Sequence, residues 1–147
     1  MSKSYQTTIT VHFGDVDPAR IVYYPIIFHY CHIAFENFWA EFVGIPYAKL
    51  LAEKQLGFPA VNAQANFSRP IKYGDTVKIK VSVVHIGKSS VEFRYQAFHE
   101  LAQDYFVAQI KVVAVDMQSF LPIALPAEYA EIFVQCQDCQ HESQAIE

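Results

Sequence analysis

The chain changes its hydrophobic period along its length, and this change divides it into a mainly helical part and a β part. Residues 5–13 (YQTTITVHF) place apolar side chains at every second position, which is typical of a half-buried strand. Residues 25–43 then form a long apolar stretch without glycine, opened by a proline of the kind that a first helical turn tolerates. Most of the circumference of that helix is apolar, so we expect other elements to enclose it.

After a second short helical segment at residues 45–57, which Gly57 closes, apolar residues recur at every second position. The predicted strands cover residues 60–70, 76–86, 90–100 and 104–117, with turn signals in KYGD and IGKS. The last strand is apolar on both faces near its end, which favours a central position in the sheet. A closing helix is predicted at residues 127–136, and residues 136–147 are expected to form a polar tail.

This order of elements predicts an α+β fold in which one antiparallel five-stranded sheet wraps around the long central helix. A chain of 147 residues fits a single domain, which we expect to cover residues 1–135. The sequence is 52% hydrophobic and contains 12 Phe and 9 Tyr, more than one small core requires. The surplus indicates pairing of subunits or an apolar ligand pocket.

Charge and patterning argue against several classes of protein. The formal net charge of −4 disfavours a nucleic-acid partner, whose phosphates attract basic surfaces. No apolar run approaches the roughly 20 residues that span a bilayer, and the first residues lack the apolar core of a signal peptide. The three cysteines do not form a disulfide framework. We therefore expect a cytoplasmic protein without membrane contact.

Three segments give the chain a family resemblance: FGDVDPARIVYYP, FSRPIKYGDTVKI and GKSSVEF. Together they resemble the hotdog-fold acyl-CoA thioesterases, and among these the 4-hydroxybenzoyl-CoA thioesterase family of the Pseudomonas type. The resemblance covers residues 5–133 and implies a hotdog fold, hydrolysis of an aromatic or short-chain acyl-CoA, and no cofactor. It also implies active sites at the interface of a homodimer, with two dimers pairing into a homotetramer.

The resemblance assigns roles to two residues of the stretch before the long helix. Asp17 matches the family's catalytic carboxylate, and the backbone N–H at Tyr24 matches the group that polarises the thioester carbonyl. The chemistry agrees, because a carboxylate can act as nucleophile or general base, and free N–H groups at a helix start can hold an oxyanion. The sequence does not choose between nucleophile and base. Asp15 is expected to fix the loop through hydrogen bonds to the backbone, and the rings of Tyr23 and Tyr24 either border the substrate or only pack.

The phosphates of CoA require basic or hydroxyl groups near the mouth of the pocket. The first candidates are Lys88, Ser89 and Ser90 in the turn IGKSS, because phosphate contacts lie there in the relatives. Arg69 is the second candidate. Arg20 stands where the family commonly has glycine, and it either narrows the acyl pocket, contacts CoA or points to solvent.

Other chemistry has weaker support. His29, His32 and Glu36 share one helical face, but zinc-binding histidines on a helix usually stand four residues apart. The tail motif CQDCQH lacks a fourth ligand, and the G-x-S-x-G motif of serine hydrolases is absent from the sequence. Cys31 faces the core of the predicted helix and is expected to be an inert thiol. We expect no metal site.

Three alternative functions stay open. A thioesterase acting on acyl-carrier-protein esters would use the same chemistry. A hydratase of similar fold would need a histidine beside the carboxylate, and His12, on the preceding strand, would have to reach across. A non-catalytic acyl-CoA-binding module would keep the pocket but would not need Asp17.

Overall fold

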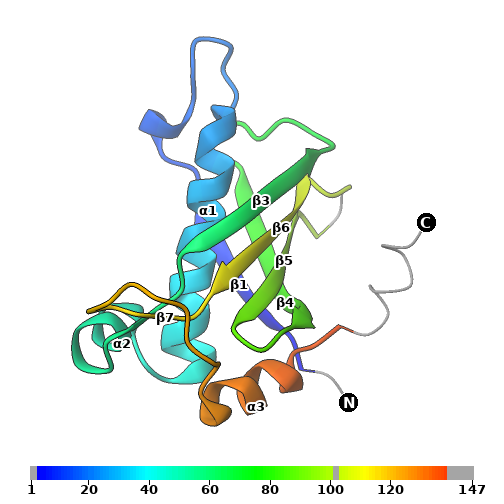
Figure 1. Ribbon diagram of the computed structural model, residues 1–147. Helices are drawn as coiled ribbons and strands as arrows, with labels where there is room; N and C mark the ends of the chain where they lie inside the picture. Colours follow the sequence, from blue (N-terminus) through cyan, green and yellow to red (C-terminus); the bar gives the residue numbers. More distant parts are fainter. Residues whose placement is uncertain (1–2, 101–102, 139–147) are drawn as a thin grey trace.

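One long helix lies along one face of a curved sheet (Figure 1). The structure is a computed structural model that describes residues 3–100 and 103–138. Five strands form the sheet in the order β1-β4-β5-β6-β3, and all neighbouring pairs are antiparallel. The strands are β1 (Tyr5–Thr10), β3 (Ala60–Phe67), β4 (Thr76–Ile86), β5 (Ser90–Phe98) and β6 (Phe106–Val113). The α+β architecture that the sequence predicts is confirmed.

Alternation along the strands decides which face of the sheet meets the helix. On β4, Val77, Ile79 and Val81 are fully buried, whereas Lys78 and Lys80 on the other face stay partly exposed. The central strand β5 alternates in the same way. Burying each such apolar side chain contributes roughly 1.5–3 kcal/mol, so a shift of one residue in register would turn the whole buried row to solvent.

The central helix changes its winding before it ends. α1 (Tyr24–Asn37) continues into the π-helical turn η2 (Phe38–Val43), and the chain leaves the helix at Gly44. Gly44 has a φ of 99°, a left-handed conformation that glycine adopts without a steric penalty. The bounds predicted for this helix are therefore nearly correct, while its wider last turn has no signature in the hydrophobic period.

Aromatic rings fill the space between the helix and the sheet. The ring centroid of Phe38 lies 5.6 Å from that of Phe93 on β5 and 6.3 Å from that of Phe133 on α3 (Ala127–Gln135). Trp39 meets the same Phe133 ring edge-on at 5.8 Å. Much of the aromatic surplus in the sequence thus belongs to the core of a single chain.

The second helical segment is shorter than predicted. α2 (Tyr47–Glu53) ends before Gln55, which has a φ of 53°, and the strand β2 (Leu56–Gly57) follows. The prediction that Gly57 stops a helix is wrong. A Cβ atom at Gly57 would lie 2.5 Å from the Met117 Sδ atom, so glycine permits the close packing of two chain segments here.

The prediction of one continuous strand at residues 104–117 is also wrong in part. The segment divides at Ala114 into β6 and the short β7 (Val115–Asp116), while β6 lies inside the sheet, between β5 and β3, as its apolar faces predict. The apolar residues at the end of the segment are explained by pairing outside the main sheet. Val115 pairs with Gly57 on one side and with Pro122 on the other, outside the main sheet.

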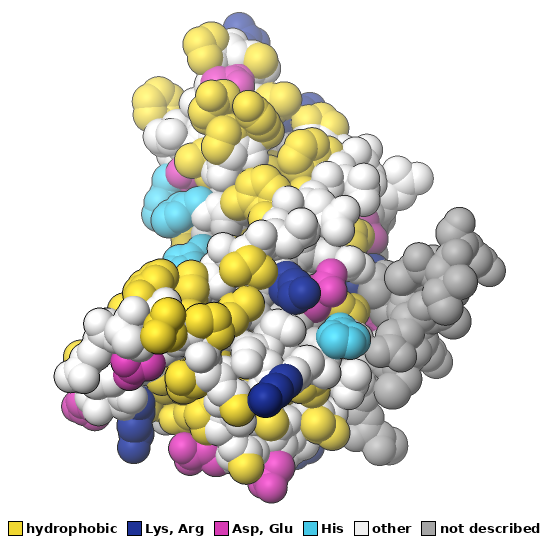
Figure 2. Space-filling model, in the orientation of Figure 1, with side chains coloured by type: hydrophobic (Ala, Val, Ile, Leu, Met, Phe, Trp, Pro, Cys, Tyr) yellow, Lys and Arg dark blue, Asp and Glu magenta, His cyan; other side chains and the backbone are white. Residues whose placement is uncertain are grey.

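Phe13 does not extend the first strand as its spacing predicts. β1 ends at Thr10, and Phe13 opens a short 3₁₀ turn, η1 (Phe13–Asp15), where 76% of the residue is exposed. Figure 2 shows hydrophobic side chains gathered around the tip of the molecule where this loop lies in Figure 1, with basic side chains at its margin.

The end of the described chain is anchored on the sheet. Cys136 is buried, and its carbonyl accepts a hydrogen bond of 3.0 Å from the N–H of Val83. The N–H of Lys3 donates to the carbonyl of Gln135 at 2.6 Å. The packed domain therefore runs past the expected boundary at 135, and residues 139–147 of the expected tail lie outside the described residues.

The two contrasting phenylalanines give a test of this core. Phe38→Ala is expected to lower the free energy of unfolding by about 3–5 kcal/mol, because it removes a fully buried ring and leaves a cavity. Phe13→Ala is the matched control and should change it by less than about 0.5 kcal/mol. Urea unfolding followed by circular dichroism measures both, and equal losses would contradict the placement of the two rings.

Candidate active site

The loop before the central helix is a tight hairpin with Asp17 at its turn. Val16 pairs with Val22, the N–H of Asp17 donates to the carbonyl of Ile21 at 3.0 Å, and the N–H of Arg20 donates to the carbonyl of Asp17 at 2.8 Å. The Asp17 carboxylate accepts a hydrogen bond from the N–H of Ala19 at 2.8 Å through Oδ1. These bonds hold the carboxylate in one orientation while the residue stays partly open to solvent.

Asp15 ties this hairpin to three places in the fold. Its Oδ2 atom accepts hydrogen bonds from the N–H of His12 at 2.9 Å and from the hydroxyl of Tyr30, in the middle of α1, at 2.7 Å. Its carbonyl accepts a third from the N–H of Tyr23 at 3.0 Å. Burial, together with the bond to Asp15, raises the pKa of Tyr30 well above its usual value, so the hydroxyl stays a donor at neutral pH. The predicted backbone bonds of Asp15 are confirmed.

Arg20 adopts a backbone conformation that glycine would take without strain. Its φ is 70°, in the left-handed region that costs an L-residue with a side chain about 1–2 kcal/mol. A glycine at this position, which the resemblance implies for the family, would avoid this penalty. Since this chain keeps an arginine there, the side chain is retained against a backbone penalty.

The start of α1 carries the backbone N–H of Tyr24, the group that the family resemblance assigns to the thioester carbonyl. Tyr23 is the N-cap residue and Tyr24 the first helical residue, with Pro25 following. The N–H of Tyr24 is one of the first four of the helix, which have no partner within the helix. Tyr23 and Tyr24 are 51% and 59% exposed, so neither is a core residue, and their rings meet edge to face with centroids 5.4 Å apart.

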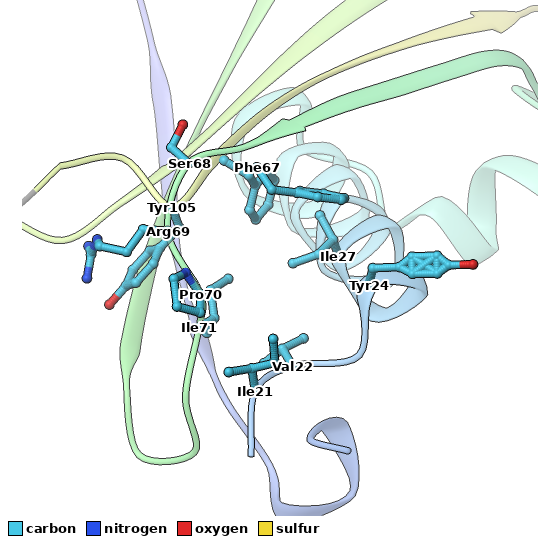
Figure 3. Close-up of a pocket in the computed structure, with 11 residues that line it drawn as sticks. Ile21, Val22, Tyr24, Ile27, Phe67, Ser68, Arg69, Pro70, Ile71 and Tyr105 are labelled. Carbon is cyan, nitrogen blue, oxygen red and sulfur yellow. The ribbon is translucent and has the colours of Figure 1, made fainter. Parts of the chain in front are cut away.

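An apolar pocket of about 300 Å³ opens beside the start of the helix (Figure 3). Its walls come from α1 and the loop before it, from the end of β3 and the segment after it, and from the start of β6: Ile21, Val22, Tyr24, Ile27, Phe67, Ser68, Arg69, Pro70, Ile71, Tyr105 and Phe106. In Figure 3, Ile27, Val22 and Ile71 approach the centre from three sides, while the ring of Tyr24 points away from it. We call this the apolar pocket.

Arg69 is held at the margin of the apolar pocket. Its guanidinium carbon lies 3.8 Å from the centroid of the Tyr105 ring, and its Nη2 and Nε atoms donate to the carbonyl of Gln103 at 2.8 and 3.3 Å. Figure 3 places Arg69 and Tyr105 on the side of the pocket opposite Tyr24. The structure thus brings Arg69 and Tyr24 to one pocket.

Asp17 lines a different and wider pocket of about 670 Å³. Its other lining residues are Phe13, Gly14, Val16, Pro18, Arg20, Lys72 and Tyr73, and we call it the cationic pocket. A pair of chain segments separates the two pockets, because Ile21 pairs with Lys72 and the N–H of Val22 donates to the carbonyl of Ile71 at 2.8 Å. Within one chain, Asp17 and Tyr24 are therefore close in sequence but line different ones of these two pockets.

The structure does not bring Lys88, Ser89 and Ser90 to Asp17 in the same chain. Lys88 and Ser89 lie in the turn after β4 and Ser90 begins β5; the 11 residues of β4 span about 35 Å at roughly 3.3 Å per residue. The other end of β4 follows the turn that carries Lys72 and Tyr73, beside Asp17. The carbonyls of Lys88 and Ser89 are bonded to the N–H groups of Leu125 and Ala114 at 2.9 and 2.7 Å.

Of the residues that share a pocket with Asp17, the sequence singled out Arg20 but not Phe13, Lys72 and Tyr73. Lys72 and Tyr73 belong to KYGD, which marks only a turn, and the structure confirms the turn with Gly74 at a φ of 93°. Phe13 is expected to be a strand residue, yet it is exposed beside Tyr73. No local signal joins residues 13 and 73, because their contact depends on the pairing of two loops.

The remaining candidate groups have ordinary structural partners. In the described parts of the chain, no group of three His, Cys, Asp or Glu side chains is placed to hold a metal ion. The Nε2 atom of His32 lies 2.8 Å from Glu36 Oε2 on the exposed side of α1. Burial raises the pKa of the Cys31 thiol far above its usual range, so it stays protonated. No helix within the described residues is long and apolar enough to cross a membrane.

The fold and the loop together define a hotdog-fold protein with a carboxylate at the mouth of its central helix. Residues 11–133 match the family model of the thioesterase-like superfamily. The chain belongs to this superfamily, and it is a thioester hydrolase.

Two curated relatives carry the same name, 1,4-dihydroxy-2-naphthoyl-CoA hydrolase. The protein from Crocosphaera subtropica is 30% identical over 100 residues, covering 68% of this chain and 72% of the relative. The protein from Thermosynechococcus vestitus is 25% identical over 124 residues, covering 84% and 83%.

Solved structures confirm the hotdog fold. A 1,4-dihydroxy-2-naphthoyl-CoA thioesterase from Synechocystis superimposes with a TM-score of 0.80 at 20% identity, covering 90% of this chain and 96% of that chain. A mutant 4-hydroxybenzoyl-CoA thioesterase in complex with 4-hydroxybenzoyl-CoA also gives 0.80, at 24% identity and with 92% and 100% covered. Likeness to the Pseudomonas-type family in particular stays a prediction.

The strained backbone at Arg20 predicts a stabilising substitution. Arg20→Gly should raise the free energy of unfolding by about 0.5–1 kcal/mol, because the relief of the left-handed conformation exceeds the entropy cost of glycine. Arg20→Ala keeps a Cβ atom and should give no such gain. Parallel urea titrations compare the two, and a gain in Arg20→Ala as large as in Arg20→Gly would contradict a backbone origin.

The hydrogen bond between Tyr30 and Asp15 predicts that its removal by substitution destabilises the fold. Tyr30→Phe should lower the free energy of unfolding by about 1.5–3 kcal/mol, because a buried hydroxyl bonded to a carboxylate is lost. Tyr23→Phe removes an exposed hydroxyl and should leave it within about 0.5 kcal/mol. Thermal and urea unfolding measure both, and an unchanged Tyr30→Phe would show that the bond is not needed to hold the loop.

Proposed function

We propose that the chain hydrolyses an aromatic acyl-CoA thioester to the free acid and CoA, with Asp17 as the reacting carboxylate. The observation that carries the proposal is the position of Asp17, fixed by its hairpin directly before the N-terminus of the enclosed helix. The names of the relatives support an aromatic CoA ester, since they act on dihydroxynaphthoyl-CoA or, in one solved structure, bind 4-hydroxybenzoyl-CoA. The apolar pocket of about 300 Å³ suits a small aromatic or short acyl group.

In this proposal the reaction begins at the carbonyl carbon of the thioester. An Asp17 oxygen attacks that carbon, CoA leaves as the thiolate, and water then hydrolyses the mixed anhydride. In the second route, Asp17 takes a proton from a water molecule that attacks instead. In both routes the carbonyl oxygen becomes negative and accepts a hydrogen bond from the N–H of Tyr24, a kind of contact worth about 3 kcal/mol of barrier.

The proposal includes a second chain because the proposed catalytic and CoA-binding groups lie apart from one another within a single chain. Asp17 and Tyr24 line different pockets, and Lys88, Ser89 and Ser90 stand at the far end of β4. The edge strand β3 supports a homodimer: it pairs only with β6 in the sheet, and almost all of its residues are exposed. Two such dimers would pair further, which would bring the Lys88 turn of another chain toward the substrate.

Thiol release from a panel of acyl-CoA esters tests the function. The panel runs from acetyl to palmitoyl and includes benzoyl, 4-hydroxybenzoyl, phenylacetyl and dihydroxynaphthoyl esters, with acyl-carrier-protein esters as a separate arm. The wild type should turn over aromatic CoA esters fastest. Asp17→Asn should lower kcat by about 10²–10⁴-fold, since the amide neither attacks nor takes a proton.

Asp116→Asn is the matched control for Asp17→Asn. Asp116 also accepts a backbone N–H within a turn, from Ser119 at 2.9 Å, but that turn follows β7 and lines neither of the two pockets. Its substitution should leave kcat within about twofold of the wild type. Full turnover by a folded Asp17→Asn would remove Asp17 from the mechanism. Faster turnover of acyl-carrier-protein esters would identify these, and not CoA esters, as the substrate.

A further inference from the structure

The hairpin that carries Asp17 ends where α1 begins. Its rungs are backbone pairings that join Asp17 to Ile21, Val16 to Val22 and Asp15 to Tyr23. Tyr24, whose N–H is proposed to hold the carbonyl oxygen of the thioester, follows the last of these residues directly. The rungs fix the shape of the hairpin, but rotation about the Cα–C bond of Tyr23 would still turn it against the helix.

A buried hydroxyl within α1 fixes this remaining angle. Tyr30 is 1% exposed, and its hydroxyl donates to the Oδ2 atom of Asp15 at 2.7 Å. Tyr30 lies six residues beyond Tyr24, which is about 9 Å along the helix axis at 1.5 Å per residue. The hairpin is also tied to residues 71 and 72, which belong to a loop and not to the helix. The bond to Tyr30 therefore gives the hairpin a second, well-separated point of attachment on α1 itself.

The bond between Tyr30 and Asp15 is of a strong kind. A carboxylate acceptor makes a hydrogen bond shorter and about twice as strong as a bond between neutral groups. Burial and the neighbouring Asp15 raise the pKa of the Tyr30 hydroxyl far above its usual value, so the proton that makes the bond is kept at neutral pH. The same Oδ2 atom accepts the N–H of His12 at 2.9 Å, which holds the carboxylate from the other side.

We propose that Tyr30 is a positioning residue for the hydrolysis: through Asp15, its hydroxyl sets the angle at which Asp17 meets a thioester held at the Tyr24 N–H. This inference rests on the proposed function, since it takes Asp17 as the reacting carboxylate. Asp17 lines the cationic pocket and Tyr24 the apolar pocket, so their relative orientation decides whether both can reach one ester group. A displacement of about 1 Å at a reacting group can lower the rate about 10²-fold.

Tyr30→Phe keeps the buried ring and removes only the bond to Asp15. It should lower kcat for the preferred acyl-CoA about tenfold and change KM less than about twofold, because the walls of both pockets are kept. Tyr5→Phe is the matched control. The buried Tyr5 on β1 also donates its hydroxyl to a carboxylate, Glu41 Oε1 at 3.0 Å, at the opposite end of the central helix from the hairpin (Figure 1). It should lose a comparable amount of stability while kcat stays within about twofold of the wild type.

Substitutions of Asp15 test whether Tyr30 acts through it. Asp15→Asn keeps an oxygen that accepts both donors and should retain kcat within about threefold, whereas Asp15→Ala should lower kcat at least as far as Tyr30→Phe. The double variant Asp15→Ala/Tyr30→Phe should lose no more than Asp15→Ala alone, because groups that act as one unit are not additive. Losses that multiply in the double variant would overturn the link between the two residues.

Hydrogen exchange gives a readout that does not depend on turnover. The N–H groups of Asp17 and Tyr23, which form rungs of the hairpin, should exchange about tenfold faster in Tyr30→Phe and Asp15→Ala than in Tyr5→Phe. Exchange and kinetics are measured well below the unfolding midpoint of the least stable variant, and Asp15→Ala provides the same comparison where Tyr30→Phe does not fold.

The outcomes separate this inference from the proposed function. If the wild type hydrolyses acyl-CoA esters but Tyr30→Phe keeps full kcat, the positioning role is refuted and the thioesterase stands. If Tyr5→Phe loses as much kcat as Tyr30→Phe, the loss reflects stability and the inference is overturned as well. If the wild type hydrolyses no ester, the proposed function falls and the positioning role falls with it.

Discussion

The carboxylate of Asp15 is the contact on which the geometry of the site depends. It joins the segment that follows β1, through the N–H of His12, to the middle of α1, through the hydroxyl of Tyr30. Its own carbonyl holds the N–H of Tyr23, the residue that caps the helix. The loop that carries Asp17 is therefore braced against the two elements on either side of it. A reacting group in a loop gains accuracy when rigid elements support it in this way.

The same bracing explains how two pockets arise from one short stretch. Once Tyr23 is fixed, Val22 and Ile21 run beside Ile71 and Lys72, and this pairing forms a wall. Aliphatic and aromatic side chains with Arg69 at the margin border one pocket, and Asp17, Arg20 and Lys72 border the other.

Local patterns predicted those parts of the structure that depend on neighbours in sequence. The bounds of β4 follow from the alternation of Val77 to Val83, and the end of the central helix follows from Gly44. The left-handed backbone at Arg20 was not predicted, because an arginine gives no local signal for a positive φ. Phe13 and Tyr73 could not be predicted as neighbours, because sixty positions separate them and only the folded loops bring them together. Likewise, the distance of Lys88 from Asp17 depends on the direction of β4, which no motif encodes. The split of the last strand at Ala114 depends on Gly57 offering a partner from another segment.

The hydrogen bond between Lys3 and Gln135 joins the first and the last parts of the packed chain. Because the first and the last parts of the packed chain lie against each other, a circularly permuted chain would connect the same elements in another order and keep their packing. A short linker could join the two ends, and new ends could be opened in an exposed turn without breaking the sheet. The site loop lies at the opposite end of the helix from this junction (Figure 1), so such a rearranged chain would keep the loop continuous.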